Sequence, residues 1–295
     1  MPTPAESLVE TLTSGNPVDA IRQLDESALL TAWLPELDAG RGFSQPELHH
    51  FDVLNHNIAT LAAVDTALGN GEPGFELRAT VGWVNLDESL EREIEGVPLM
   101  ALIRLACLVH DIAKPATAVF AEGRLRFPRH GPRGAEILAG RLPGLGFGPE
   151  ATRFVTTMTR YHLRPGELIR SWPVSDRAVR KFVNDLDGHV LPLMLVNLSD
   201  GMATRGPHYT RENYRRHCAF TNYVLARAMA VSDEGDPPLV TGDDLVEHLN
   251  LESGRLLGAV LTSVRQAQAE GAVSDREEAL ALARSVLASL QANER

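Results

Sequence analysis

The sequence predicts an all-α fold, a bundle of helices with further helical segments at its N-terminal and C-terminal ends. Apolar residues recur at helical spacing along most of the chain, and Pro, Gly and capping residues separate the successive segments. Alternation of apolar and polar residues, which is typical of strands, is confined to residues 75–86, where we expect an irregular or partly extended insertion. The 295 residues, 44% of them hydrophobic, suffice for one large domain or two modest ones.

The segment 99–110 is predicted to form a central, buried helix. Pro98 is suited to begin it, and nearly every following residue up to His110 is apolar, which leaves little polar face for solvent. Pro115 ends the segment because proline cannot continue a helix. Further helices are predicted at about 51–68, 132–142, 149–162, 175–186, 189–203 and 211–231, with two more near the C-terminus, the last beginning with Ser274 and Glu277 in capping-box spacing.

Two stretches have the composition of loops. Residues 69–74 are rich in Gly and residues 232–238 in acidic residues, Gly and Pro, and neither continues a helical pattern. The second stretch separates a main body from a smaller helical tail. We therefore expect an N-terminal helical segment over 1–45, a main domain over 46–231 and a C-terminal helical segment over 239–295.

Charge is distributed unevenly along the chain. The formal net charge is −11, yet residues 122–181 contain twelve Arg and Lys against five Asp and Glu, a local excess of +7 that leaves −18 on the rest. Many of these arginines are expected simply to occupy solvated helix faces. The clustering nevertheless favours a local anionic partner over general adhesion to nucleic acid or membranes.

The composition also excludes several classes of protein. No stretch approaches the ~20 apolar residues of a membrane span, and the first residues contain neither the basic leader nor the apolar run of a signal peptide. We expect a cytoplasmic protein that does not associate with membranes. Cys107 and Cys218 both fall in helical, apolar surroundings and are predicted to be small buried side chains rather than nucleophiles or disulfide partners.

The adjacent pair His110-Asp111 closes the apolar central helix and is the first indication of chemistry. An imidazole and a carboxylate side by side can bind one metal ion, or the carboxylate can bridge two. Asp200 follows the strongly apolar stretch 191–198, where an acid needs a strong partner such as a metal. Three further candidate ligands lie in or at the ends of predicted helices: His56, His130 and His162. Taken one at a time, each of these three is more often a core histidine hydrogen-bonded to a carboxylate.

Taken together and in order, His56, His110-Asp111, His130, His162 and Asp200 resemble the ligand pattern of the HD-type metal-dependent phosphohydrolases. The run from His110 to Pro115, the run Phe127-Pro-Arg-His130 and the tail segment 241–245 are similar to the HD region and later helices of bacterial CCA-adding tRNA nucleotidyltransferases. The similarity extends from about residue 34 to about residue 287. It implies an HD-type helical bundle, with residues 46–231 as the phosphohydrolase domain.

The chain departs from that nucleotidyltransferase family in one respect. A Gly-Gly strand-turn signature followed by Asp-x-Asp, which nucleotide addition requires, does not occur in these residues, so nucleotide addition is not expected. The resemblance implies a phosphomonoesterase or phosphodiesterase acting on nucleotides or RNA ends, with 2′,3′-cyclic phosphates and 2′-nucleotides as implied substrates. Two alternatives stay open: a deoxynucleotide or alarmone hydrolase of the same type, and a non-catalytic helical module that binds RNA or acts as a scaffold.

The resemblance also implies how metal ions would be held. One ion would be bound by His56, His110, Asp111 and Asp200, and a second by His130 and His162, with Asp111 bridging the two. Imidazole and carboxylate ligands suit Mn²⁺, Fe²⁺, Ni²⁺, Co²⁺ or Zn²⁺, and Mg²⁺ less well because imidazole is a poor ligand for it. We expect two divalent ions, with Mn²⁺ ranked first.

A phosphorylated small molecule or nucleotide substrate needs cationic side chains beside the metals. Lys114 follows His110 by one helical turn and is one of only two lysines in the chain, so we assign it a catalytic and substrate-binding role next to the catalytic Asp111. Its alternative role is to complement a helix dipole. Arg133 and Arg205, near His130 and Asp200, are further candidate phosphate ligands. The remaining histidines are predicted to lie outside the site: His49, His50, His189, His208, His217 and His248.

Overall fold

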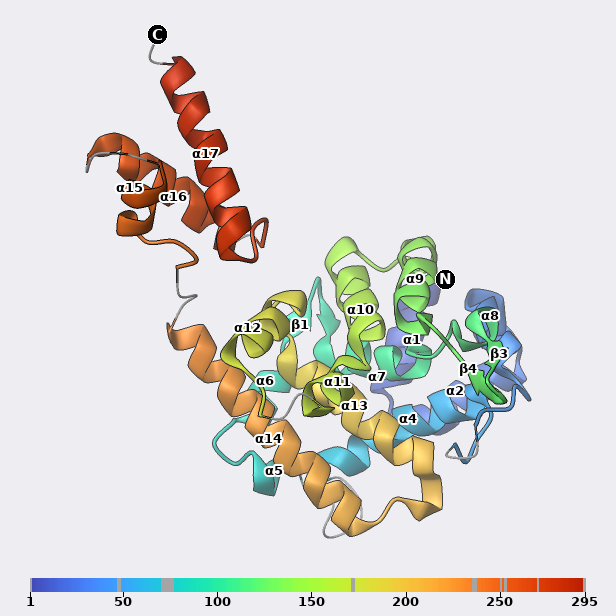
Figure 1. The fold of residues 1–295 in the computed structure, drawn as a ribbon. Coiled ribbons are helices and arrows are strands. Elements are labelled where there is room, and N and C mark those ends of the chain that lie inside the picture. Colours follow the sequence, from blue (N-terminus) through green and yellow to red (C-terminus); the bar gives the residue numbers. More distant parts are fainter. Residues whose placement is uncertain are drawn as a thin grey trace. The chain divides into compact units, whose positions relative to one another are not determined.

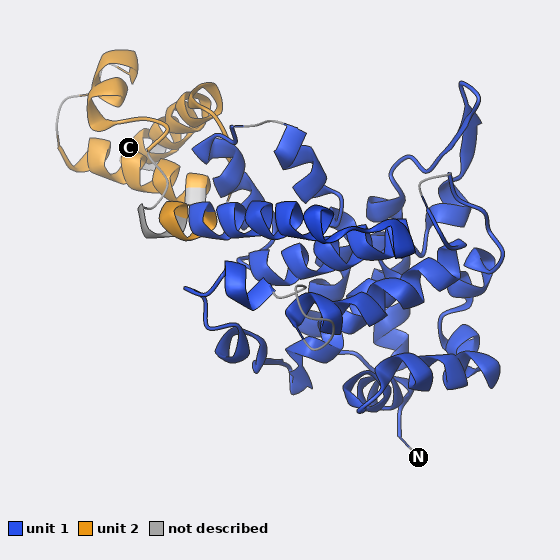
Figure 2. Cartoon of the chain, turned by 90° about the horizontal axis from the view of Figure 1, so that it is seen from below, with its two compact units in different colours: residues 1–227 blue, residues 228–295 orange. Residues whose placement is uncertain are grey.

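The computed structural model confirms the all-α prediction (Figure 1). It describes residues 2–46, 49–69, 77–170, 173–234, 238–249, 251, 254–269 and 271–293. Within these ranges the β-structure consists of two small antiparallel pairs of strands. The chain forms two compact units, residues 1–227 and residues 228–295 (Figure 2).

The N-terminal helices pack onto the main body and are bounded by recognisable caps. Thr3 and Glu6 form a reciprocal capping box at the start of the first helix, and Asn16 caps the second. Leu8, Leu12 and Ile21 are completely buried. The elements are α1 (Pro4–Thr13), α2 (Pro17–Glu26), α3 (Leu29–Trp33) and the 3₁₀ helix η1 (Pro35–Gly40).

The predicted helix after Pro98 is central, as expected. Its apolar residues are almost entirely buried, Cys107 among them, because the helix contacts α1, α4, α10 and α13. Gly131 permits α9 to approach α10 closely, since a Cβ there would lie 2.9 Å from the carbonyl oxygen of Arg160. The helices of this core are α4 (Val53–Leu68), α7 (Leu99–Val109), α9 (His130–Leu145), α10 (Pro149–Tyr161) and α13 (Val190–Arg205).

The insertion predicted at 75–86 is irregular, as expected, but its described residues 77–86 are not extended. Residues 77–90 contain two short helices, and the apolar spacing arises because Leu77, Val81, Leu86 and Leu90 are each buried from short helical turns. A pair of two-residue strands follows, too short to show alternation in sequence. The elements are α5 (Leu77–Thr80), α6 (Leu86–Leu90), β1 (Glu93–Ile94) and β2 (Val97–Pro98).

A β-hairpin that the sequence prediction missed connects α8 (Lys114–Thr117) to α9. Its strands are β3 (Val119–Ala121) and β4 (Arg124–Arg126). The turn between them places Glu122 at φ 53° and Gly123 at φ 72°, the left-handed pair typical of tight hairpin turns. Strands of three residues are too short to give a periodic signal, which is why the hairpin was not predicted.

The first unit is completed by α11 (Arg164–Arg170), α12 (Asp176–Asp185), the 3₁₀ helix η2 (Gly206–His208) and α14 (Arg211–Glu234). The loop predicted at 232–238 begins too early, because α14 continues to Glu234 and across the boundary between the two units. Residues 235–237, like residues 70–74 of the other predicted loop, lie outside the described residues. Cys218, on α14, is buried as predicted.

The second unit is a small helical bundle with its own core. Val240, Leu245, Val260 and Val264 are buried in it. The last helix is capped one residue later than predicted: Asp275 accepts hydrogen bonds from the backbone of the first turn, while a Glu278 oxygen accepts from the Ser274 backbone. None of the helices in the described ranges is long and apolar enough to cross a membrane. The helices are α15 (Gly242–Leu249), α16 (Arg255–Ala269) and α17 (Arg276–Asn293).

Candidate metal centre

Asp111 lies where four imidazole rings from different helices meet. His56 comes from the first turn of α4, His110 and His162 directly follow α7 and α10, and His130 begins α9. The Nε2 atoms of His56 and His110 are 3.3 and 3.1 Å from Asp111 Oδ2. The Nε2 atoms of His130 and His162 are 3.1 and 3.5 Å from Asp111 Oδ1. Each oxygen of this carboxylate therefore faces its own pair of imidazoles.

The side chains form two potential metal sites that share Asp111. His56 and His110 make the first group with it, and His130 and His162 make the second, with the ligand atoms of each group within 4.8 Å of one another. Asp200, from α13, joins the first group: its Oδ1 is 3.1 Å from the His56 Nε2 and 3.7 Å from the His110 Nε2. All six predicted ligands are thus brought together.

The hydrogen bonds of the rings favour metal binding. His110, His130 and His162 each direct Nδ1 at the carbonyl oxygen three residues earlier, at 2.8 Å in every case. A neutral imidazole that donates from Nδ1 has an unprotonated Nε2. Yet the Nε2 atoms of His130 and His162 are only 3.1 Å apart. Two lone pairs cannot bond to each other, and a divalent cation beside them would be a partner for both.

The electrostatics of the buried carboxylates point the same way. Burial alone would raise the pKa of Asp111, but His110 and Lys114 lower it well below the usual range. Burial would also raise the pKa of Asp200, and its hydrogen bonds to His110 and His56 lower it. In turn, burial would lower the pKa of His110, but the two carboxylates raise it to about 10. The site therefore stabilises positive charge strongly.

Lys114 is part of the same buried cluster. Its Nζ is 2.5 Å from Asp111 Oδ2 and donates to Gln45 Oε1 at 2.7 Å, and the side chain lies beside the Phe127 ring, 5.5 Å from its centroid. Only 5% of the residue is exposed. A turn through residues 111–113 places it there, rather than the continuous helical path expected from the sequence. Lys114 can therefore contact a group bound at Asp111.

The two predicted arginines lie differently. Arg133 is 56% exposed along its side chain and pairs with Glu136 at 2.9 Å, one turn further along α9. Arg205 is exposed at the last position of α13, five residues beyond Asp200. Within the described ranges, neither guanidinium makes a hydrogen bond or ion pair with a predicted metal ligand. Their assignment as phosphate ligands stays a prediction.

Comparison with known proteins gives a family relationship. No family model matches the chain. It is 31% identical over 280 residues to a CC-adding tRNA nucleotidyltransferase of Thermus thermophilus, covering 94% of this chain and 54% of that protein. It is 28% identical over 274 residues to an A-adding tRNA nucleotidyltransferase of Deinococcus radiodurans, covering 92% and 55%. The chain is related to tRNA nucleotidyltransferases. This part of the resemblance inferred from sequence is confirmed, and the chain spans about half the length of these relatives.

A shorter match involves a second kind of enzyme. The chain is 27% identical over 174 residues to a bifunctional uridylyltransferase/uridylyl-removing enzyme of Ruegeria pomeroyi, covering 58% of this chain and 17% of that protein. The names of both sets of relatives describe nucleotidyl transfer, and the second also describes nucleotidyl removal.

In this relative of the tRNA nucleotidyltransferases, two residues that the sequence did not assign to the site lie beside Lys114. Gln45 accepts its hydrogen bond, and the His49 Nε2 is 3.4 Å from its Nζ. Burial, with Lys114 and His56 nearby, lowers the pKa of His49 to about 4. Both residues precede α4 outside any periodic segment, so no sequence signal distinguished His49 from the other unassigned histidines.

A chain of hydrogen bonds holds the backbone of His162 in place. Asn197 donates from Nδ2 to the His162 carbonyl oxygen at 3.2 Å, which leaves its Oδ1 to accept from the His217 Nε2 at 2.8 Å. The other ring nitrogen of His217 is 3.3 Å from the Tyr209 hydroxyl. His217 therefore donates from Nε2, and in the neutral ring its Nδ1 accepts from the Tyr209 hydroxyl.

Replacing His217 with Gln is expected to reduce the acid sensitivity of the fold. Burial lowers the pKa of His217 to about 4, against the opposing effect of Asp200. Unfolded chains bind this proton near pH 6.5, so stability falls as pH falls from 6.5 to 4. Wild type should lose roughly 2–3 kcal/mol more than His217→Gln over that interval. Urea unfolding in EDTA at both pH values measures this, and equal losses would contradict it.

Removing a ligand of the second group is expected to lower metal occupancy. His130 and His162 face only Asp111 Oδ1, whereas His56 and His110 face Oδ2. His130→Ala or His162→Ala should therefore reduce bound Mn²⁺ from about two toward one per chain. Elemental analysis after dialysis checks this. If the ratio of metal to protein does not change, His130 and His162 hold no second ion, and the centre binds a single one.

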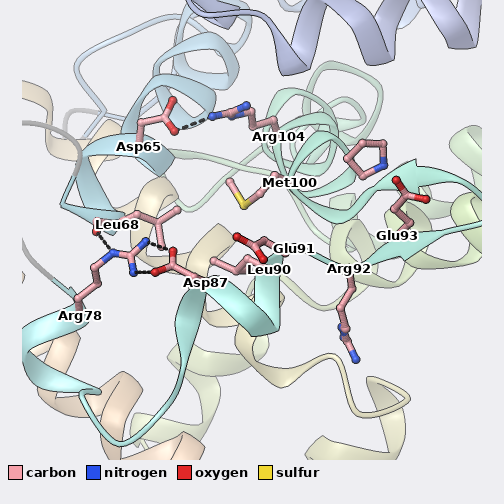
Figure 3. Close-up of a pocket in the computed structure, with 11 residues that line it drawn as sticks. Asp65, Leu68, Arg78, Asp87, Leu90, Glu91, Arg92, Glu93, Met100 and Arg104 are labelled. Atoms are coloured by element: carbon pink, nitrogen blue, oxygen red, sulfur yellow. Dashed lines mark hydrogen bonds and ion pairs between the residues drawn. The ribbon is translucent and has the colours of Figure 1, made fainter.

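The cavity in Figure 3 is separate from this centre. It has a volume of about 350 Å³ and lies between α4, α6 and α7. Two of its arginines are already paired: Arg78 with Asp87 at 2.6 Å and Arg104 with Asp65 at 2.7 Å. None of the predicted site residues lines it. Because its main charges neutralise one another, we do not assign it the catalytic chemistry.

Proposed function

We propose that this chain is a divalent-metal-dependent phosphohydrolase acting on nucleotides or RNA ends. The observation that carries the proposal is the buried Asp111 carboxylate, each oxygen of which faces a separate pair of imidazole nitrogens. A carboxylate placed in this way is suited to bridge two divalent ions. A merely structural role would leave the Nε2 atoms of His130 and His162 buried 3.1 Å apart with no partner that satisfies both, which is costly.

The ligand set favours Mn²⁺ over Mg²⁺ because four imidazoles accompany two carboxylates. When bound, two such ions supply a polarised phosphate and a water of lowered pKa. The protein contributes the rest. The Nδ1 hydrogen bonds fix the rings, and the short contact of Lys114 with Asp111 places an ammonium group within reach of a phosphate oxygen.

The substrate class is supported by the relatives and by charge. The related proteins are named for transferring or removing nucleotidyl groups. The local excess of +7 over residues 122–181 includes the segments that carry His130 and His162. We therefore propose phosphate esters of nucleotides, with 2′,3′-cyclic phosphates and 2′-nucleotides first among them on the basis of the HD resemblance. The cytoplasm is the compartment where we propose that it acts.

The test is metal analysis of the purified protein together with a substrate panel. The panel contains a 2′,3′-cyclic nucleotide, a 2′-nucleotide, a deoxynucleoside triphosphate and an alarmone, each with Mn²⁺, Ni²⁺, Mg²⁺, Zn²⁺ or EDTA. We expect metal-dependent opening of the 2′,3′-cyclic ester to a phosphomonoester, and release of phosphate from the 2′-nucleotide. Release of triphosphate or pyrophosphate instead would identify the alternative nucleotide hydrolase. If the purified protein holds no metal and turns over none of the substrates, the remaining interpretation is the non-catalytic helical module.

A further inference from the structure

The β3–β4 hairpin has the most exposed large apolar side chain in the described part of the protein. Phe120 is 76% exposed, more than any other large hydrophobic residue described there. The hairpin lies at the edge of the first unit, beside α8 and α9 (Figure 1). An aromatic ring left in water at the centre of a short hairpin does not stabilise this fold, which suggests a role in binding.

Both ends of the hairpin are attached to the metal centre. β3 follows α8, which begins with Lys114. β4 is followed by Phe127, whose carbonyl oxygen accepts the Nδ1 hydrogen bond of His130 and whose ring lies beside Lys114. Strand geometry puts Leu125, the partner of Phe120, roughly 7 Å from Phe127 along the chain. A molecule held on Phe120 therefore contacts the segment that connects Lys114 to His130, outside the centre itself.

The charges around the hairpin favour an anionic occupant. Arg126 pairs with Glu122, but no ion-pair partner of Arg124 or Arg129 lies among the described residues. Arg124 and Arg126 extend from the ribbon face opposite Phe120, as their register with Ala121 and Val119 requires. Arg129 directly precedes the ligand His130, between the hairpin and the centre. The hairpin thus carries an apolar ring on one face and guanidinium groups on the other, and a chain that carries both bases and phosphates can contact both faces across the edge of this two-stranded ribbon.

We propose that Phe120 stacks on an unpaired base of a single-stranded RNA whose terminal phosphate lies at the metal centre. The inference rests on the proposed phosphohydrolase function and narrows its substrate from nucleotides to short single strands. Aromatic rings bind bases in this way without sequence preference, because every base has a π-face, and nearby cations hold the backbone. The stacked base belongs to a nucleotide upstream of the terminal one, since the centre itself receives the end.

The experiment measures binding and turnover separately. Binding of a 5′-fluorescein single-stranded RNA hexamer is followed by anisotropy in EDTA, where hydrolysis cannot occur. Phe120→Ala should weaken binding about tenfold, and Phe120→Trp should retain it. Leu29→Ala, which removes another exposed apolar side chain on α3, is the matched control and should bind like wild type. Arg124→Ala should lower the salt dependence of log Kd by about one.

Turnover is then compared for a hexamer and a mononucleotide with the same 2′,3′-cyclic phosphate end. Phe120→Ala should raise KM about tenfold for the hexamer and leave KM for the mononucleotide unchanged. Wild type that binds no RNA, or a Phe120→Ala variant that binds as tightly, would overturn the stacking surface, whatever the mononucleotide result. If RNA binding depends on Phe120 but neither substrate is hydrolysed, the stacking proposal is supported and the proposed phosphohydrolase activity is overturned.

Discussion

Replacing Asp111 with alanine is expected to abolish metal-dependent phosphate release while leaving the helical fold intact. Asp111 is the only one of the six predicted ligands that faces both imidazole pairs, so its loss removes a ligand from each metal at once. Removing a residue that only orients a metal ligand typically lowers metal affinity or activity about ten- to a hundredfold. Removing a ligand shared by two ions should lower activity by more than that, and the amount of bound metal should fall together with kcat.

The control for Asp111→Ala is Asp65→Asn. Asp65 is a partly buried carboxylate of the same core, but it pairs with Arg104 at 2.7 Å and touches none of the proposed ligands. The Asp65 variant should keep its metal and its turnover. Circular dichroism on both proteins establishes that they are folded. Near-native turnover of Asp111→Ala at saturating Mn²⁺ would show that the assignment of the whole centre is wrong.

Replacing Lys114 with alanine is expected to lower kcat/KM about ten- to a hundredfold with the metal retained. The ammonium group is buried and 2.5 Å from Asp111, so a phosphate bound there gains a charge-assisted hydrogen bond worth roughly 1.5–3 kcal/mol. The measurement is steady-state kinetics on the best substrate, with metal content and thermal midpoint taken on the same preparation.

The second lysine provides a matched control. Lys181 is 68% exposed along its side chain and pairs with Asp185 on α12, so Lys181→Ala should leave kcat/KM unchanged. If Lys114 served only to complement a helix dipole, its loss would cost about 0.3–1 kcal/mol of stability and no activity. Normal kcat/KM with a slightly lowered midpoint would therefore remove Lys114 from the site and leave Arg133 as the leading phosphate contact.

The sequence predicted which side chains lie together because helical periodicity and a family resemblance coincide. Helical periodicity placed the buried helix before His110, and the resemblance to the HD pattern selected His56, His130, His162 and Asp200 as its companions. The structure places all of them within one cluster. These ligands lie within helices or at helix ends, and those positions are what periodicity and capping rules predict best.

The remaining features depend on contacts that no local pattern reports. Gln45 and His49 reach Lys114 from a segment 65 or more positions away, and only the packed chain brings them there. The β3–β4 hairpin has strands too short to alternate. The Arg133 side chain points toward Glu136, with which it forms an ion pair. Their three-residue separation on a helix allows this pair but does not require it.

Three imidazole rings are anchored to backbone carbonyl oxygens three residues earlier, two in the last turns of α7 and α10 and one in the segment before α9, at 2.8 Å each. The tautomer and direction of each ring are therefore set while the helices pack, before any ion arrives. Most of the conformational entropy needed to arrange the ligands is lost during folding rather than during binding. Unlike zinc-finger peptides, which fold only around their ion, this fold arranges its proposed ligands in advance, so a bound ion would not have to order them.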